Sequence, residues 1–171
     1  GCYPSAQAAF LLNHGLETLH LRMERHCQNA DQVARFLQQH SKVESVNYPT
    51  LAEDPYHQLA QKYLPNGCSG VISFSLTGGR EAAVRFIDSL KLASLVVHVA
   101  DVRTLVLHPA SSTHRQLTDE QLVAAGIHPG MIRLSVGIEH VDDIIEDLKQ
   151  ALEQALSPFF DVHNKQKLWE V

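Results

Sequence analysis

One arginine stands inside an otherwise apolar stretch of this 171-residue sequence, and its charge needs a chemical explanation. Arg133 lies in the run Met-Ile-Arg-Leu-Ser-Val at 131–136. A buried charge without a partner is expensive, so the guanidinium must be paired. One interpretation is that its planar fork binds a ligand carboxylate through two hydrogen bonds. The alternatives are a structural pair with Asp101 or Glu139, or a solvent-facing arginine, and the pattern alone favours these.

A short polar stretch precedes this arginine and is the second candidate for a site. Residues 108–114 read His-Pro-Ala-Ser-Ser-Thr-His, between two apolar runs. Polar loops between strands often line binding sites. The alternative is a turn closed by its own hydroxyl groups, and it is favoured when no other information is used.

The histidines and cysteines do not have the spacing of a metal site. His14, His20 and His26 are six residues apart, so they do not share one helical face, and His108 and His114 have the same separation. No cysteine joins them at ligand spacing. Nucleotide-binding, nucleophile-elbow and zinc-protease motifs are also absent from the sequence. We therefore expect no metal, and reduced thiols in a cytoplasmic protein, from the three cysteines: Cys2, Cys27 and Cys68.

Charge and composition exclude several classes of protein. The chain has 14 Lys+Arg against 19 Asp+Glu, which argues against binding to nucleic acid. No apolar run reaches the roughly 18 residues of a membrane span, and the first residues do not resemble a secretory signal. The 44% of hydrophobic residues predicts one folded domain with a core. The start without Met leads us to expect a processed or truncated product.

The first 40 residues have apolar side chains at steps of three and four, which predicts one long helix. Gly15 lies inside this pattern and costs about 1 kcal/mol relative to alanine, so a kink or break there is plausible. Such a helix is longer than a small domain needs. We expect it to reach a second domain or subunit.

The rest of the sequence alternates short strands with helices. Strands are expected at 43–48, 69–76, 95–99, 104–107 and 131–136, and helices at 55–63, 80–90, 118–126 and 141–156. This order predicts an α/β, two-layer fold: an open, largely antiparallel sheet with helices on one face. The expected organisation is an interdomain helix over 1–40, a domain over 41–156 and a tail over 157–171 without clear periodicity.

Six short motifs follow one another along the chain. They are Gly-Leu-Glu-Thr-Leu at 15–19, Leu-Arg-Met-Glu-Arg-His at 21–26, Val-Asn-Tyr-Pro at 46–49, Arg-Thr-Leu-Val-Leu-His-Pro-Ala-Ser at 103–111, Thr-His at 113–114 and Ile-Arg-Leu-Ser-Val-Gly-Ile-Glu at 132–139. In order and spacing they resemble the C-terminal region of the pyridoxal-phosphate enzymes of cysteine and methionine metabolism. The resemblance covers residues 1–156 and is closest to the O-acetylhomoserine sulfhydrylase branch, with cystathionine γ-synthase, cystathionine γ-lyase and methionine γ-lyase as alternatives.

The resemblance implies a role for three residues. Arg133 would bind the α-carboxylate of the amino-acid substrate, and Thr113 would lie near that carboxylate. His98 stands where the family usually has Asn or Ser; it can still donate a hydrogen bond and can titrate. Ala100 replaces the usual glycine before Asp101, so the local turn is expected to differ.

The resemblance also implies parts that this sequence lacks. The fold would be that of the small C-terminal domain of aspartate-aminotransferase-like enzymes, in a homo-oligomer. The Schiff-base lysine and the other groups that hold pyridoxal phosphate would belong to an N-terminal domain, so this chain alone is expected to be inactive and free of cofactor. The six lysines do not match that motif: Lys42, Lys62, Lys91, Lys149, Lys165 and Lys167.

A non-enzymatic alternative stays open. The chain could persist as a small α/β module that self-associates through an exposed apolar face of residues 6–23.

Overall fold

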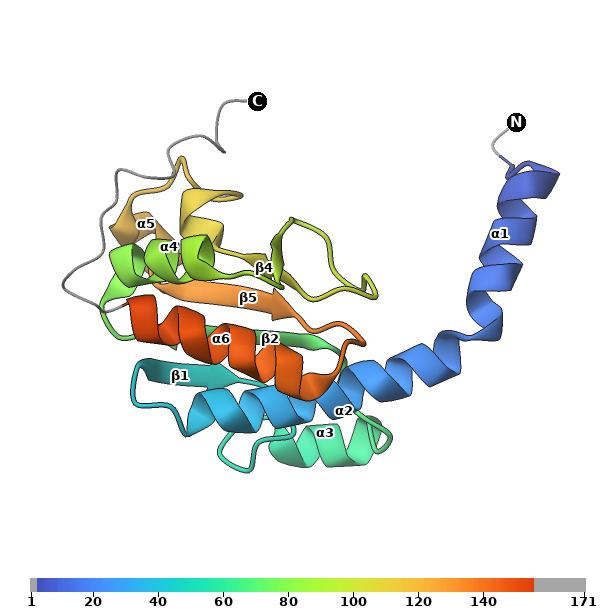
Figure 1. The fold of residues 1–171 in the computed structure, drawn as a ribbon, viewed down its shortest axis with the longest axis horizontal. Coiled ribbons are helices and arrows are strands. Elements are labelled where there is room, and N and C mark those ends of the chain that lie inside the picture. Colours follow the sequence, from blue (N-terminus) through green and yellow to red (C-terminus); the bar gives the residue numbers. More distant parts are fainter. Residues whose placement is uncertain (1–2, 156–171) are drawn as a thin grey trace.

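Two helices, rather than one, occupy the first 40 residues. The structure, a computed structural model, describes residues 3–155 and shows α1 (Ala6–Glu17) and α2 (Leu19–Gln38) separated at Thr18. Figure 1 shows α1 turned away from the body of the molecule. Ser5 caps α1 through a hydrogen bond from the Ala8 amide, yet α1 buries none of its residues. No tertiary packing holds α1 in line with α2, and the predicted N-terminal helix is interrupted. The break that the sequence allowed at Gly15 falls three residues later, at Thr18.

Five strands form the open, largely antiparallel sheet that the sequence predicts. They are β1 (Val43–Asn47), β2 (Val71–Leu76), β3 (Ser94–Leu95), β4 (Leu105–Leu107) and β5 (Met131–Ser135). Their order is β1-β2-β5-β4-β3, and only the β3–β4 pair is parallel.

The strand expected over 95–99 is much shorter than the pattern indicates. Only Ser94 and Leu95 pair with β4, followed by one further hydrogen bond from the Val96 amide to the Val106 carbonyl. The chain then leaves the sheet, and the next two carbonyls, of Val97 and His98, accept hydrogen bonds from Arg133.

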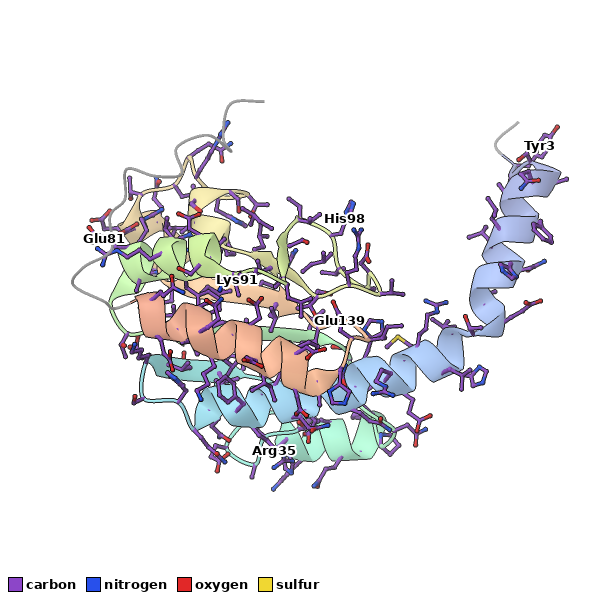
Figure 2. All side chains as sticks on the ribbon, in the orientation of Figure 1. Tyr3, Arg35, Glu81, Lys91, His98 and Glu139 are labelled. Carbon is purple, nitrogen blue, oxygen red and sulfur yellow. The ribbon has the colours of Figure 1, made fainter. Side chains whose placement is uncertain are left out.

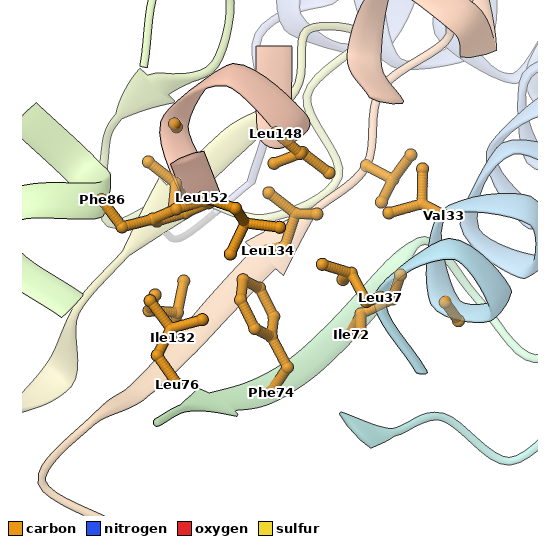
Figure 3. Close-up of a cluster of buried hydrophobic side chains, with 14 of the residues drawn as sticks. Val33, Leu37, Ile72, Phe74, Leu76, Phe86, Ile132, Leu134, Leu148 and Leu152 are labelled. Carbon is orange, nitrogen blue, oxygen red and sulfur yellow. The ribbon is translucent and has the colours of Figure 1, made fainter. Parts of the chain in front are cut away.

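Helices cover one face of the sheet, as predicted. The remaining ones are α3 (His57–Tyr63), α4 (Gly79–Ser89), α5 (Asp119–Ala124), α6 (Val141–Ala155) and a 3-10 turn, η1 (Pro109–Ser111). In Figure 1, α2, α4 and α6 lie over the sheet, and Figure 3 shows the core between them. The labelled core side chains are Val33, Leu37, Ile72, Phe74, Leu76, Phe86, Ile132, Leu134, Leu148 and Leu152.

Strand alternation fixes the direction of the candidate site. Ile132 and Leu134 are fully buried under the helices. Because neighbouring side chains of a strand point to opposite faces, Arg133 lies on the face that these helices leave open.

Within residues 3–155, no helix is both long and apolar enough to cross a bilayer. The expected tail over 157–171 falls outside the described residues.

Candidate carboxylate-binding site

Arg133 sits in the middle of β5, beside Ser73 of β2 and Leu107 of β4. Its Nη2 donates to the carbonyl oxygens of Val97, at 2.5 Å, and His98, at 3.2 Å. Its Nε is buried and has no hydrogen-bond partner among the described residues. A guanidinium has five N–H donors in a fixed plane, so this side chain retains donors for a further acceptor.

The structural interpretation that pairs Arg133 with Asp101 or Glu139 is wrong. Asp101 accepts hydrogen bonds from the backbone amide and Nε of Arg103, at 2.9 and 3.2 Å. The hydrogen bond from the Arg103 side chain is the largest influence on the Asp101 carboxyl and lowers its pKa. Glu139 accepts from the amide and hydroxyl of Thr104, at 2.6 and 2.9 Å. Both carboxylates therefore accept hydrogen bonds from groups other than Arg133.

His98 meets Arg133 through its backbone rather than its ring. Figure 2 labels it on the loop between β3 and β4, and its side chain is exposed. The carbonyl of His98 accepts from Arg133, so the structure brings these two predicted site residues together.

The same loop is attached to β5 a second time, two residues beyond Arg133. The Ala100 amide donates to Oγ of Ser135 at 3.0 Å. Ala100 has a φ of +64°, the left-handed region that glycine favours. The turn at the position where the family usually has glycine is therefore made by alanine in a glycine-like conformation. Ser135 was not predicted as part of the site, although its even spacing from Arg133 on one strand places it on the same face.

Thr113 lies beyond η1 and is exposed. Its hydroxyl is 2.9 Å from Nδ1 of His114, and no interaction joins it to Arg133 in the part of the chain that the structure describes. Thr113 is linked to Arg133 only indirectly. It follows η1, which comes directly after β4, and Leu107 of β4 is the register partner of Arg133 on β5.

His108 anchors the polar stretch instead of binding a ligand. It is 1% exposed, with Nε2 2.8 Å from the Pro129 carbonyl and Nδ1 2.8 Å from Oγ of Ser111. A carbonyl only accepts, so Nε2 carries the proton and Nδ1 accepts from the serine hydroxyl. Burial lowers the pKa of His108, against the opposing effect of the Pro129 carbonyl. Sequence reasoning missed the other anchor of this stretch, Arg80, which donates to the Ala110 carbonyl and pairs with Asp119.

Two histidines of the N-terminal helices have partners other than a metal. His26 is buried, and its Nδ1 lies 2.6 Å from the Val136 carbonyl, so this nitrogen donates. His14 contacts Glu17 on the exposed surface of α1. Within residues 3–155, no group of three or more His, Cys, Asp or Glu side chains could hold a metal ion.

Comparison with a solved structure defines the class of protein. An O-acetylhomoserine (thiol)-lyase, as that protein from Campylobacter jejuni is described, superposes with a TM-score of 0.80 and 49% identity, over 86% of this chain and 35% of the other. That structure contains N'-pyridoxyl-lysine-5'-monophosphate, a lysine adduct of the cofactor. The chain thus has the fold of one part of a fold-type I pyridoxal-phosphate enzyme.

The family follows from the sequence match. Residues 1–153 match the Cys/Met metabolism PLP-dependent enzymes, and the chain belongs to this family, as the motifs predicted. It is 53% identical over 146 residues to a homocysteine synthase of Schizosaccharomyces pombe, covering 85% of this chain and 34% of that protein. It is 49% identical over 146 residues to an O-acetyl-L-homoserine sulfhydrylase of Leptospira meyeri, covering 85% and 33%. An L-methionine gamma-lyase of Fusobacterium nucleatum is 47% identical over 154 residues, covering 90% and 39%.

The chain spans about a third of the length of these relatives. Four of the six lysines lie in the part of the chain that the structure describes. Nζ of Lys42 donates to the carbonyls of Leu152 and Glu153 at the end of α6, and Nζ of Lys62 lies 5.0 Å from the ring centre of Tyr63. Lys91 and Lys149 are exposed.

Proposed function

We propose that this chain provides the substrate-carboxylate site of an enzyme of the O-acetylhomoserine sulfhydrylase type, in homocysteine and methionine biosynthesis. The observation that carries the proposal is the buried Nε of Arg133, which has no partner in the described structure and lies on the open face of the sheet. A carboxylate is the acceptor that a guanidinium binds most strongly, because two parallel N–H donors meet its two oxygens.

The two carbonyls on Nη2 give Arg133 a positioning frame. Val97 and His98 occupy Nη2 of the guanidinium, which leaves the donors of Nε and Nη1 for a ligand. Thr113 and His98 are proposed to contribute further hydrogen bonds to the same carboxylate from the rim, since both side chains are exposed and belong to segments next to β5. The cofactor, when bound, supplies the electron sink for the chemistry, and this chain supplies the orientation of the substrate.

We further propose that the lysine and phosphate-binding groups lie on a separate N-terminal domain, the partner of this one. The support is that the described lysines are surface groups or cap α6. In this proposal the isolated chain neither fixes pyridoxal phosphate on borohydride reduction nor turns over substrate.

The test is a chimera. The matching segment of the Leptospira meyeri O-acetyl-L-homoserine sulfhydrylase is replaced by residues 1–153 of this chain, and homocysteine formation from O-acetylhomoserine and sulfide is measured. Arg133→Lys in the chimera is expected to lower kcat/KM roughly 100-fold, because a lysine ammonium cannot offer the two parallel N–H donors of a guanidinium. Arg103→Lys is the matched control, since Arg103 is exposed and pairs only within its own loop.

Equal activity of the Arg133→Lys and Arg103→Lys chimeras would show that Arg133 does not bind the substrate. Borohydride-fixed cofactor on the isolated chain would show that the cofactor-binding part of the proposal is wrong.

The similarity to L-methionine gamma-lyase supports a second candidate activity within the family. The same chimera is given methionine in place of O-acetylhomoserine and sulfide. Release of α-ketobutyrate at a higher kcat/KM than homocysteine formation would favour the lyase.

A further inference from the structure

Two free cysteines from separate elements meet at one place in the molecule. Cys27 lies on α2 and Cys68 in the connection from α3 to β2, and both are partly exposed free thiols. They line one open hollow between α2 and this connection, together with His20, Met23, Leu64 and Ser69.

The glycine between the two elements shows how close they are. A methyl group added to Gly67 would lie only 2.7 Å from both Cβ and Sγ of Cys27. Gly67 is bonded to Cys68, so their Cα atoms are about 3.8 Å apart. The sulfur of Cys27 therefore touches the neighbour of Cys68 in the chain. A disulfide requires a Cα–Cα separation of about 4.4–6.8 Å, so the two cysteines must come within this range for the bond to form.

The turn that carries Cys68 is held in a defined shape. Gly67 and Ser69, on either side of it, have φ values of +130° and +104°. The hydroxyl of buried Tyr48 donates to the Ser69 carbonyl at 2.9 Å. Cys68 is thus presented beside α2 by a fixed turn rather than by a free loop.

We propose that Cys27 and Cys68 form a site of reversible oxidation, in which a small-molecule disulfide of the glutathione type converts the two thiols into one intramolecular disulfide. A thiolate of one cysteine attacks the small disulfide, which forms a mixed disulfide and releases one thiol. The second cysteine attacks the protein sulfur of the mixed disulfide and releases the other thiol. The protein loses two electrons and two protons, and the small disulfide becomes two thiols.

The bond would join α2 to the base of β2 at a particular point of the helix. Cys27 directly follows His26, the first buried residue of α2, whereas the preceding turns of α2 extend away from the body. The disulfide would therefore fix the place where the N-terminal helices leave the domain. Burial raises the pKa of the Cys68 thiol, so the reaction is expected to quicken as the solution becomes alkaline.

The experiment uses the whole chain with Cys2→Ser, because Cys2 lies outside the described residues. The protein is incubated with glutathione disulfide and examined by intact mass, thiol titration and peptide mapping without reduction. The expected result is a mass lower by two hydrogen atoms, loss of both thiols, a cross-linked peptide pair containing Cys27 and Cys68, and a higher Tm that dithiothreitol reverses.

Cys27→Ala and Cys68→Ala in the same background serve as matched controls, with circular dichroism to confirm folding. Each should retain one thiol that only accepts a glutathione adduct. The proposal is overturned if the protein with both cysteines ends as a glutathione adduct, as a disulfide-linked dimer, or with both thiols unreacted while glutathione disulfide oxidises a small dithiol in the same solution.

Discussion

Ala100 has an unfavourable backbone conformation at the edge of the candidate site. Its φ of +64° places Cβ close to the following carbonyl oxygen, which costs an L-residue about 1–2 kcal/mol relative to glycine. The cost is tolerated because the Ala100 amide is held by Ser135, on the strand that also carries Arg133.

Ala100→Gly is therefore expected to raise the free energy of unfolding by about 1 kcal/mol, after the greater freedom of glycine in the unfolded chain is included. Urea unfolding followed by circular dichroism measures the change. Ala125→Gly is the control: Ala125 has an ordinary φ of −84°, so the same substitution should lower stability. A loss of stability in both variants would contradict the assigned strain.

His108 is expected to make the folded state less stable in mild acid. Burial holds its pKa below the ordinary value of 6.5, so between the two values the unfolded chain binds more protons than the folded one. Its contribution is complete above pH 6.5 and is lost as the pH falls toward the folded pKa, by at most about 1.4 kcal/mol per pH unit. His108→Gln should therefore flatten the fall of Tm below pH 6.5 relative to the unsubstituted chain. The same slope with and without His108 would exclude this side chain as the cause.

The sequence marks the arginine of the site but not what surrounds it. An arginine between Ile132 and Leu134 is conspicuous because its charge conflicts with its neighbours. Its observed partners, the carbonyls of Val97 and His98, have no sequence signature, since every residue has a carbonyl. Acidic residues such as Asp101 attract attention as partners, yet that carboxylate is bound locally by Arg103. Whether Arg133, Thr113 and His98 bind substrate stays a prediction.

At the scale of elements, periodicity located most helices and strands within a few residues. The two differences from the expected elements arise where tertiary contacts decide the structure. The helical pattern of the first 40 residues continues through Thr18, but α1 has no packing partner in the described structure to hold it straight. The apolar run at 95–99 has strand-like residues, but Leu95 is the only one of them that belongs to β3, where it pairs with Val106 of β4.

One carboxylate on α6 organises the segment that leads to this short strand. Asp147 is buried, and its oxygens accept from the backbone amides of Lys91, Leu92 and Ala93 at 2.8–3.0 Å. Three donors at one anion form a nest that fixes the route from α4 to β3. The segment then continues to the carbonyls that frame Arg133.

Asp147→Ala is expected to lower the free energy of unfolding by about 3 kcal/mol, because it leaves three buried or half-buried amides without an acceptor. Asp143→Ala, at an exposed position in the first turn of the same helix, should cost less than about 1 kcal/mol. Urea denaturation of both variants gives the comparison. Similar losses of unfolding free energy in the two variants would show that the hydrogen bonds from Asp147 to the amides of residues 91–93 add little to stability.

At the scale of the whole molecule, the apolar surface is unevenly distributed. The core between α2, α4, α6 and the sheet is closed, whereas the N-terminal helices expose a row of large apolar side chains, several of them more than half exposed. They are Phe10, Leu11, Leu12, Leu16, Leu19, Leu21 and Met23. Exposed patches of this kind mark surfaces that another chain or domain covers. This exposure is the feature that the sequence pattern of residues 6–23 predicted.

Without a covering domain, this surface is expected to drive association of the isolated chain with a second copy. Sedimentation velocity should show a weight-average mass above that of the monomer, rising with protein concentration. Leu16→Glu, on a helix that buries nothing, removes apolar area without disturbing the core and should shift the equilibrium toward monomer at least several-fold. Gln7→Glu adds the same charge at an exposed polar position of α1 and should change the equilibrium much less. A chain that stays monomeric at all concentrations would contradict the prediction and show that an apolar arm of this size is tolerated in water.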